Sequence, residues 1–344
     1  MANLEKLLQK FSFYLYYFVY EIFYYLIGSL AIVEDIVYRK RNKCSLQKRT
    51  GEVAIVTGGA RGIGLSLVKN LLMCDMTVII GCRKTTAGEV AIDKLRTAGL
   101  NSGLAKVIEL DLMSLKSVKD FAHKVKSEFE AISLMINNAG IMFPPYIESE
   151  DGYESQWQVN YLAPFLLTHL LLPAFEHAGE VSGKNARIVN VTSCAHVVSL
   201  PINFDNINKK DYYIPSAVYA QSKLAQILFS MELDNYLKTK QSKVRVLSVH
   251  PGIVNTDLFN GTLLKTIFPW LLKYICKDVE EGATSVLYPC LSPTLENVGG
   301  VYISNCQLKN PSSLAKDKAL QAKLFQHSLN ALNIKEFGVA ISSN

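Results

Sequence analysis

A short apolar run followed by closely spaced glycines constrains the fold of this chain more than any other stretch. Residues 53–57 read VAIVT, the β-branched pattern of a buried parallel strand, and GGARGIG follows at 58–64 before a helical pattern begins. Glycines in such a turn let the backbone approach a pyrophosphate, which then lies on the free N–H groups at the start of the helix. The spacing T-G-x-x-x-G-x-G therefore predicts a dinucleotide site. Its candidate residues are Thr57, Gly58, Arg61, Gly62, Ile63 and Gly64.

Further strand patterns alternate with helical patterns along the chain. Strands are expected at 77–82, 106–112 and 134–140, with helices at 87–98 and 114–129 between them. Such alternation predicts an α/β fold in which a single Rossmann-type domain contains a doubly wound parallel sheet. Asp111 and the small polar run Asn137-Asn138-Ala139-Gly140 follow the third and fourth strands. We expect them at the carboxyl edge of the sheet, where this architecture binds ligands.

The end of the second strand bears on the choice of cofactor. The strand TVIIGC ends at Arg83 and Lys84, and no acidic residue stands there to bind the ribose hydroxyls of NAD(H). A basic residue at this place suits a 2′-phosphate, and Arg61 lies in the glycine turn nearby. The sequence therefore favours NADP(H) over NAD(H), which remains open because Arg83 could simply face solvent.

The charge of the chain is concentrated in one segment. The net charge is +6, and residues 39–49 (RKRNKCSLQKR) hold three Arg and three Lys, so the remainder sums to 6 − 6 = 0. This distribution gives no reason to expect nucleic acid as a partner.

The seven scattered cysteines contain no C-x-x-C pair, which favours a reducing compartment. No group of His, Cys and Asp has metal-ligand spacing, so no metal site is predicted.

Residues 11–33 form an apolar segment with one charge, Glu21. The segment is long enough to span a bilayer, although Glu21 near its centre would cost about 3 kcal/mol and its six tyrosines prefer the interface. We expect a single N-terminal membrane-anchor helix, followed by a basic linker up to residue 50 that keeps the catalytic body on the cytosolic side. A helix lying in the interface and a signal peptide cleaved near Ser29-Leu30-Ala31 are the alternatives.

Tyr219 and Lys223 stand four residues apart, which places both side chains on one face of a helix. There the ammonium could stabilise a phenolate and make the phenol a usable acid or base. The motif alone is weak, because about one such pair is expected by chance and Tyr236 with Lys240 forms a second. Ser193 ends the strand pattern RIVNVT (187–192), where its hydroxyl could join a site or simply cap a turn.

The order of these motifs resembles that of the short-chain dehydrogenase/reductase family. The matching residues are TGGARGIG, Asp111-Leu112, Asn138-Ala139-Gly140, Asn160, Ser193, Tyr219-x-x-x-Lys223 and Pro251-Gly252. The resemblance runs from about residue 51 to 335, within a catalytic domain expected at 51–344. The stretches 151–173, 187–196 and 250–259 are similar to the retinol-dehydrogenase-like branch. That branch usually has Ser-Ser where this chain has Thr192-Ser193.

The resemblance implies a catalytic set of Asn160, Ser193, Tyr219 and Lys223. Ser193 would bind the substrate oxygen, and Tyr219 would pass the proton after Lys223 and the nicotinamide lower its pKa. Lys223 would also hold the nicotinamide ribose, and Asn160 would bind a water that relays protons. The same resemblance implies further cofactor contacts from Leu112 and from the loop with Pro251, Gly252 and Thr256. The Thr256-Asp257 pair could instead cap a helix.

The substrate side is expected at 256–278, an apolar segment that covers the cleft in this family. Beside a membrane anchor it suggests a lipid-soluble alcohol or aldehyde, and an ordinary core or dimer helix is the alternative. The resemblance implies polyprenol with polyprenal or retinol with retinal as substrate, a steroid being less favoured, at the endoplasmic reticulum or a lipid droplet. A homodimer is left open. The hypothesis from another class is an inactive scaffold, against which the intact set of four catalytic residues argues.

Overall fold

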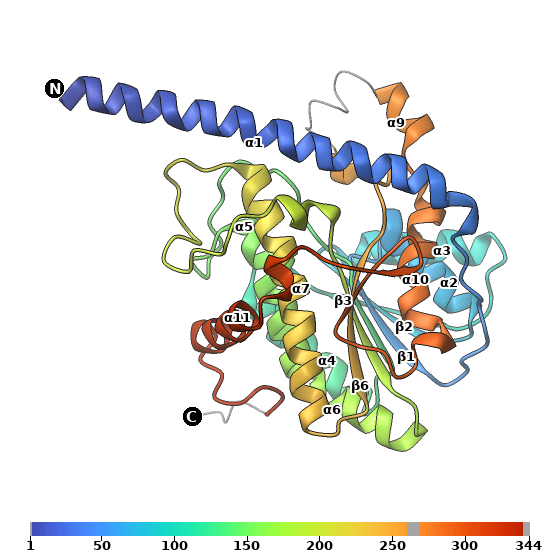
Figure 1. The fold of residues 1–344 in the computed structure, drawn as a ribbon. Helices are drawn as coiled ribbons and strands as arrows, with labels where there is room; N and C mark the ends of the chain where they lie inside the picture. Colours follow the sequence, from blue (N-terminus) through green and yellow to red (C-terminus); the bar gives the residue numbers. More distant parts are fainter. Residues whose placement is uncertain (1, 260–268, 340–344) are drawn as a thin grey trace.

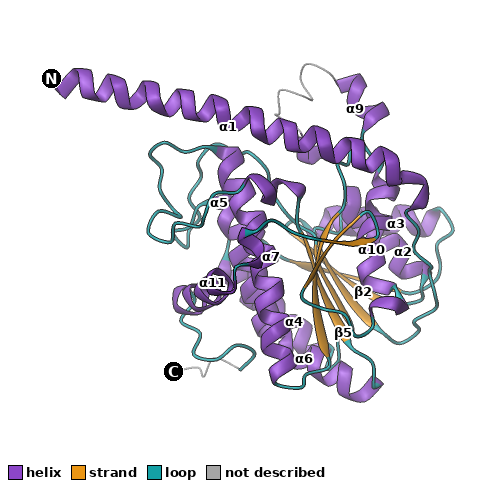
Figure 2. Ribbon diagram, in the orientation of Figure 1, coloured by secondary structure: helices purple, strands orange, loops and turns teal. Residues whose placement is uncertain are grey.

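A long N-terminal helix lies across one edge of an α/β sheet domain in the computed structural model, which describes residues 2–259 and 269–339 (Figures 1 and 2). The sheet has the strand order β3-β2-β1-β4-β5-β6-β7-β8, and every neighbouring pair is parallel except β7 with β8. The strands are β1 (Val53–Thr57), β2 (Thr77–Cys82), β3 (Leu104–Glu109), β4 (Leu134–Asn137), β5 (Ala186–Val191), β6 (Val244–His250), β7 (Val301–Ser304) and β8 (Gln307–Lys309). This order confirms the doubly wound sheet, with its topological switch between β1 and β4.

Helices cover both faces of the sheet, because the strands are apolar on both sides. The helices are α1 (Ala2–Tyr38), α2 (Gly62–Met73), α3 (Thr85–Thr97), α4 (Leu115–Glu128), α5 (Ser155–Trp157), α6 (Ala163–Ser182), α7 (Pro215–Thr239), α9 (Pro269–Ile275), α10 (Val279–Leu291) and α11 (Lys318–Ala331). Ile55 of β1 faces a core with α4, α6, α7 and α11, whereas Ala54 and Val56 face a second core with α2 and α10. The alternation along one strand thus serves two helical layers (Figure 2).

Several element boundaries differ from the sequence prediction. The third strand ends at Glu109, two residues before Asp111, because the Asp111 carboxylate turns back to accept a hydrogen bond from Met113 N at 2.9 Å. The helix expected at 87–98 is α3, which begins earlier, at Thr85, and ends at Thr97. Of the predicted cover segment 256–278, residues 260–268 lie outside the described residues, and α9 begins directly after them at Pro269.

The helix α1 is continuous through the predicted anchor and has one face against the domain. Inward positions recur at helical spacing through Tyr17, Tyr20, Tyr24, Ala31 and Asp35, all buried or half-buried. The opposite face and the N-terminal half carry exposed apolar side chains. The N-terminal half projects beyond the domain (Figure 1). The second half of the predicted anchor therefore contacts protein on one side.

In the glycine turn between β1 and α2, the backbone at Gly64 lies in close contact with the backbone at Gly58. A Cβ added at Gly64 would lie 2.2 Å from the carbonyl oxygen of Gly58, a backbone atom that cannot rotate away. Gly58 itself has φ +68°, and its N–H donates to Gly81 O at 2.7 Å. The turn therefore keeps its shape only when position 64 has no side chain.

We predict that Gly64→Ala lowers the free energy of unfolding by about 1–3 kcal/mol and abolishes dinucleotide binding, because the backbone must move to relieve the contact. Gly28→Ala is the matched control, since a Cβ there would lie more than 4 Å from every described neighbour that could oppose it. Thermal unfolding and cofactor titration of both variants check this. Normal cofactor affinity in Gly64→Ala would contradict the account of the turn.

Candidate active site

The predicted site residues gather at the carboxyl edge of the sheet. Thr57, at the end of β1, accepts hydrogen bonds on Oγ1 from the N–H groups of Asn138 and Ala139, both at 3.0 Å. Asn138 Nδ2 donates in return to Thr57 O at 3.0 Å. The ends of β1 and β4, which flank the topological switch, are thereby fixed to each other.

The start of α2 has the features of a phosphate site. Arg61 is its N-cap residue, and no side chain within the described ranges caps this end, so its first N–H groups remain free donors. A Cβ at Gly62 would lie 3.9 Å from Thr256 Cγ2, so the loop after β6 lies against the glycine turn. Because the turn admits only glycine at position 64 and leaves donors free, the residues present fit a dinucleotide pyrophosphate.

The two arginines predicted for cofactor choice lie at the surface of this edge. Arg83 follows β2 and is exposed. Arg61 is exposed too, and its Nη1 lies 3.4 Å from Asp257 Oδ2, which ties the glycine turn to the loop after β6. Such an exposed ion pair contributes at most about 1 kcal/mol, so Arg61 remains free to exchange Asp257 for another anion.

Ser193 and Tyr219 meet where β5 ends. Ser193 caps a 3-10 turn, its Oγ accepting from Ala195 N at 3.2 Å. Burial raises the pKa of the Tyr219 phenol well above its ordinary value, and a hydrogen bond with the Ser193 side chain opposes that rise. The Tyr219 ring packs edge-on against Phe143 at 5.6 Å between centroids. The phenol is therefore a buried group close to the serine hydroxyl.

Lys223 lies one helical turn after Tyr219 on α7, and its ammonium is buried. Nζ lies 5.7 Å from the centroid of the Tyr219 ring. It donates to Val191 O at 3.0 Å and to Gln226 Oε1 at 3.1 Å. Burial lowers the pKa of Lys223 to about 7. The lysine is thus poised to exchange a proton near neutral pH.

Asn160 lies in a short π-helical turn (Gln158–Leu162) between α5 and α6. Its Oδ1 accepts from Ile141 N at 2.9 Å, while Nδ2 donates to Ile141 O at 3.0 Å and to Ser222 Oγ at 3.0 Å. A Cβ at Gly140 would lie 3.1 Å from Asn160 Oδ1 and 3.5 Å from Lys223 Nζ. Asn160, Gly140 and Lys223 therefore converge, as the motif order implied. π-turns of this kind are frequent at functional sites.

Further residues support this cluster beside the four predicted ones. Thr192 Oγ1 donates to Lys223 O at 2.8 Å. The threonine that replaces the first serine of the usual Ser-Ser pair therefore has a structural role. His196 Nε2 accepts from Ser312 N at 3.1 Å, so its Nδ1–H is the donor to Ser193 O at 2.8 Å. Burial lowers the pKa of His196 to about 4, so the ring stays neutral. Gln226 could have been found from the sequence, because it lies three residues after Lys223 on the same helix face. No local pattern pointed to Ser312.

The second tyrosine–lysine pair lies at the far end of α7. Lys240 is exposed and forms an ion pair with Glu336 at 2.6 Å. Tyr236 is half-buried against Phe325, with 6.0 Å between ring centroids, so it packs instead of standing on a solvated face. The chance motif thus contacts α11 through Tyr236 and the segment after α11 through Lys240.

A family model described as short chain dehydrogenase matches residues 52–265. Short-chain dehydrogenase TIC 32 B, chloroplastic, of Brassica napus is 37% identical over 309 residues, which cover 89% of this chain and 94% of that protein. Polyprenol dehydrogenase of Homo sapiens is 35% identical over 312 residues, covering 88% and 93%. Retinol dehydrogenase 11 of Mus musculus is 37% identical over 287 residues, covering 83% and 87%.

These matches span almost the whole length of each relative as well as the sheet domain described above. They confirm the resemblance that the motif order indicated. The chain belongs to the short-chain dehydrogenase family of NAD(P)(H)-dependent oxidoreductases, in its retinol-dehydrogenase-like branch.

Proposed function

We propose that this protein is a membrane-associated, NADP(H)-preferring oxidoreductase that interconverts a hydrophobic alcohol and its carbonyl compound. The observation that carries the proposal is the convergence of Ser193, Tyr219 and Lys223 at the same edge of the sheet as the glycine turn, against an apolar aromatic wall. An inactive scaffold would have no use for a buried ammonium next to a buried phenol, because each is costly to desolvate.

The cofactor would lie across the switch between β1 and β4. Its pyrophosphate would rest on the N–H groups at the start of α2, and Arg83 would meet a 2′-phosphate at the end of β2. Asp111 and Leu112 lie beyond the end of β3, and Gly140 lies beyond the end of β4, along the same edge. When bound, the nicotinamide supplies or accepts the hydride.

The protein's own groups would handle the proton. Burial keeps the Tyr219 phenol protonated in the folded chain, so it can donate to the oxygen of a carbonyl substrate. Ser193 lies against Tyr219 and would orient the same oxygen. In the direction of alcohol oxidation, the charged form of Lys223 would stabilise the phenolate. Asn160 and Gly140, next to Lys223, mark the side from which a proton would return.

The substrate side is apolar and includes α1. Tyr219, Ala195 and Ala220 form a small core cluster with Phe143, Met142 and Tyr24 of α1. The rings of Tyr24 and Phe143 are 5.3 Å apart, edge to face. Such a wall favours a lipid-soluble substrate, and polyprenol and retinol in the names of two relatives supply the candidate classes.

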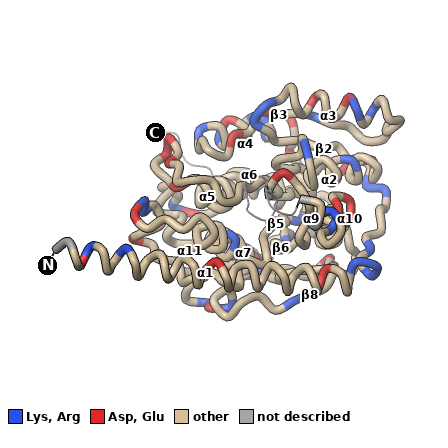
Figure 3. Tube along the Cα trace, turned by 90° about the horizontal axis from the view of Figure 1, so that it is seen from above, with Lys and Arg blue, Asp and Glu red and all other residues tan. Residues whose placement is uncertain are grey.

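The exposed face of α1 supports contact with a membrane. Large apolar side chains on it include Phe11, Tyr14, Phe18, Ile22, Phe23, Leu26, Leu30 and Val33. Charged residues are sparse along the middle of α1 and gather near its ends (Figure 3). Because its inner face contacts the domain, we infer that the second half of α1 lies in the interface, with lipid on one side.

We predict that the free energy of unfolding of the wild type, relative to Lys223→Met, rises with pH between about 7 and 10.5. In this window the unfolded chain binds a proton at Lys223 that the folded chain does not, so the slope is positive. Below pH 7 both states are protonated and the buried ammonium costs the wild type stability. Denaturant titrations at several pH values check this, and a difference independent of pH would contradict it.

We predict that Tyr219→Phe abolishes oxidation of every active alcohol in a panel of retinol, polyprenols and steroids, by at least about 10²-fold in kcat, while leaving cofactor binding intact. Tyr236→Phe is the matched control from the same helix and should retain full activity. The assay follows NADPH formation in detergent micelles. If wild type and Tyr219→Phe are equally inert with every alcohol and cofactor, the scaffold hypothesis is favoured instead.

For cofactor choice, Arg83→Asp should weaken NADPH binding at least tenfold and NADH binding little. The carboxylate would repel a 2′-phosphate and could accept hydrogen bonds from free ribose hydroxyls. Fluorescence titration with each cofactor measures both constants. An equal loss for NADPH and NADH would remove the argument for a 2′-phosphate site.

A further inference from the structure

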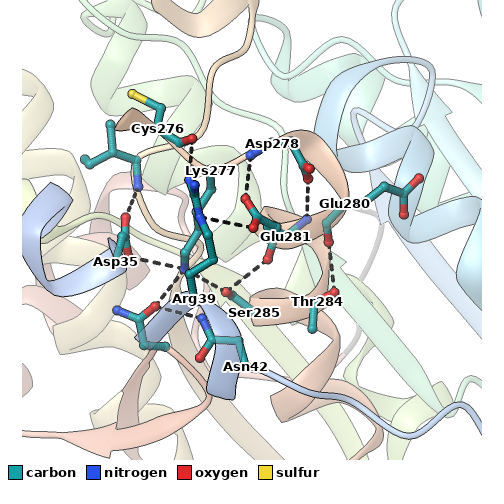
Figure 4. A network of polar contacts seen from close by, with 12 residues as sticks. Asp35, Arg39, Asn42, Cys276, Lys277, Asp278, Glu280, Glu281, Thr284 and Ser285 are labelled. Carbon is teal, nitrogen blue, oxygen red and sulfur yellow. Dashed lines mark hydrogen bonds and ion pairs between the residues drawn. The ribbon is translucent and has the colours of Figure 1, made fainter. Parts of the chain in front are cut away.

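A buried lysine stands at the junction of α1, the loop after β6 and the start of α10 (Figure 4). Lys277 is 0% exposed. Its Nζ donates to Asn305 Oδ1 at 2.8 Å, to Ser285 Oγ at 3.0 Å and to Pro251 O at 3.2 Å. All of these partners are neutral, so the charge of the ammonium has to be met by a carboxylate.

That carboxylate comes from α1. Asp35 is 1% exposed, and its Oδ1 lies 3.2 Å from Lys277 Nζ. Its second oxygen accepts a hydrogen bond from Ile253 N at 2.7 Å. A carboxylate that only ended a membrane helix would need no burial, and burying it without its lysine would cost several kcal/mol. The pair therefore exists only while α1 is docked on the domain.

The pair holds the loop after β6 on both sides of Gly252. Lys277 binds the carbonyl of Pro251, and Asp35 binds the N–H of Ile253. Gly252 has φ +94°, and a Cβ there would lie 2.6 Å from Lys277 Nζ and 2.8 Å from Asp35 Oδ2. The glycine of the Pro-Gly pair is thus required by the ion pair packed against it.

The same loop continues to the candidate cofactor contact. The Lys277 backbone pairs with the loop, its N–H donating to Ile253 O at 2.9 Å and its carbonyl accepting from Asn255 N at 3.0 Å. Thr256 comes next and lies against Gly62 of the glycine turn. Displacing α1 would leave a buried unpaired ammonium and a free Ile253 N–H, and the loop would have to rearrange.

We propose that Asp35 is a positioning residue for the cofactor: through Ile253 and Lys277 it sets the loop 251–256, so that docking of the membrane-facing helix α1 controls dinucleotide affinity. The inference rests on the proposed function, in which this loop covers the nicotinamide. It makes α1 part of the catalytic unit as well as its membrane contact.

The test uses the full chain in detergent micelles and measures the Kd of NADPH and NADH by fluorescence. Asp35→Ala should raise the Kd of the preferred cofactor at least tenfold. Glu34→Ala is the matched control from the same turn of α1; it removes an ion pair with Lys309 at 2.7 Å near the surface and should leave the Kd unchanged.

A double variant separates positioning from stability. Asp35→Leu with Lys277→Met replaces the buried pair by apolar groups, an exchange that is often neutral or stabilising. It should recover the thermal stability that Asp35→Ala loses, yet keep the weak Kd, because neither new side chain can bind Ile253 N or Pro251 O. A double variant with wild-type Kd would overturn the proposal, and it answers the question even if Asp35→Ala fails to fold.

The outcomes also separate this proposal from the proposed function. If the wild type binds a cofactor and Asp35→Ala binds it equally well, the positioning role is wrong and the proposed function stands. If the wild type binds neither cofactor, the proposed function fails and the inference fails with it. Hydrogen exchange at residues 251–257 gives a readout besides affinity, and faster exchange in Asp35→Ala but not in Glu34→Ala is expected.

Discussion

Two lysine ammonium groups are buried at the carboxyl edge of the sheet, and satisfying them fixes much of the surrounding backbone. A buried ammonium costs several kcal/mol unless oxygen atoms surround it. Lys223 draws in the last carbonyl of β5, and Lys277 draws in the carbonyl that follows β6. The ends of two neighbouring strands are therefore held by cations, and the loops that leave them start from fixed points. In the proposed mechanism both loops carry groups that meet the cofactor or the substrate.

The two lysines are paired differently, and the difference matches their proposed tasks. Lys277 has a carboxylate partner, Asp35, and forms a buried ion pair with it. Within the described residues Lys223 has a carbonyl and an amide oxygen as its hydrogen-bond acceptors, and burial brings its pKa to about 7. A lysine that exchanges protons needs the second environment, because a buried carboxylate would hold the proton on it. The same residue type thus serves support in one place and chemistry in the other.

Sequence reasoning reached the fold and the positions of the candidate site because both depend on local patterns. The β-branched run before Gly58, the glycine spacing and the four-residue step from Tyr219 to Lys223 each act within a few residues. What it missed depends on contacts between distant segments. Asp35 lies just beyond the apolar segment 11–33, and Lys277 lies at the end of the segment 256–278. No periodicity connects them, so the pairing that makes α1 part of the domain could only come from the structure.

The aromatic wall above Tyr219 links the substrate class to the chemistry. Phe143 and Tyr24 exclude water, which suits a lipid-soluble alcohol and also raises the pKa of the Tyr219 phenol. An apolar pocket alone would therefore leave the tyrosine an acid with no means of acting as a base. Positive charge has to be supplied beside it, by Lys223 and by the bound nicotinamide in its oxidised form. Because Tyr24 belongs to α1, the helix proposed to face the membrane also helps to set how strongly the phenol holds its proton, and in the proposed mechanism substrate access and proton transfer share one wall.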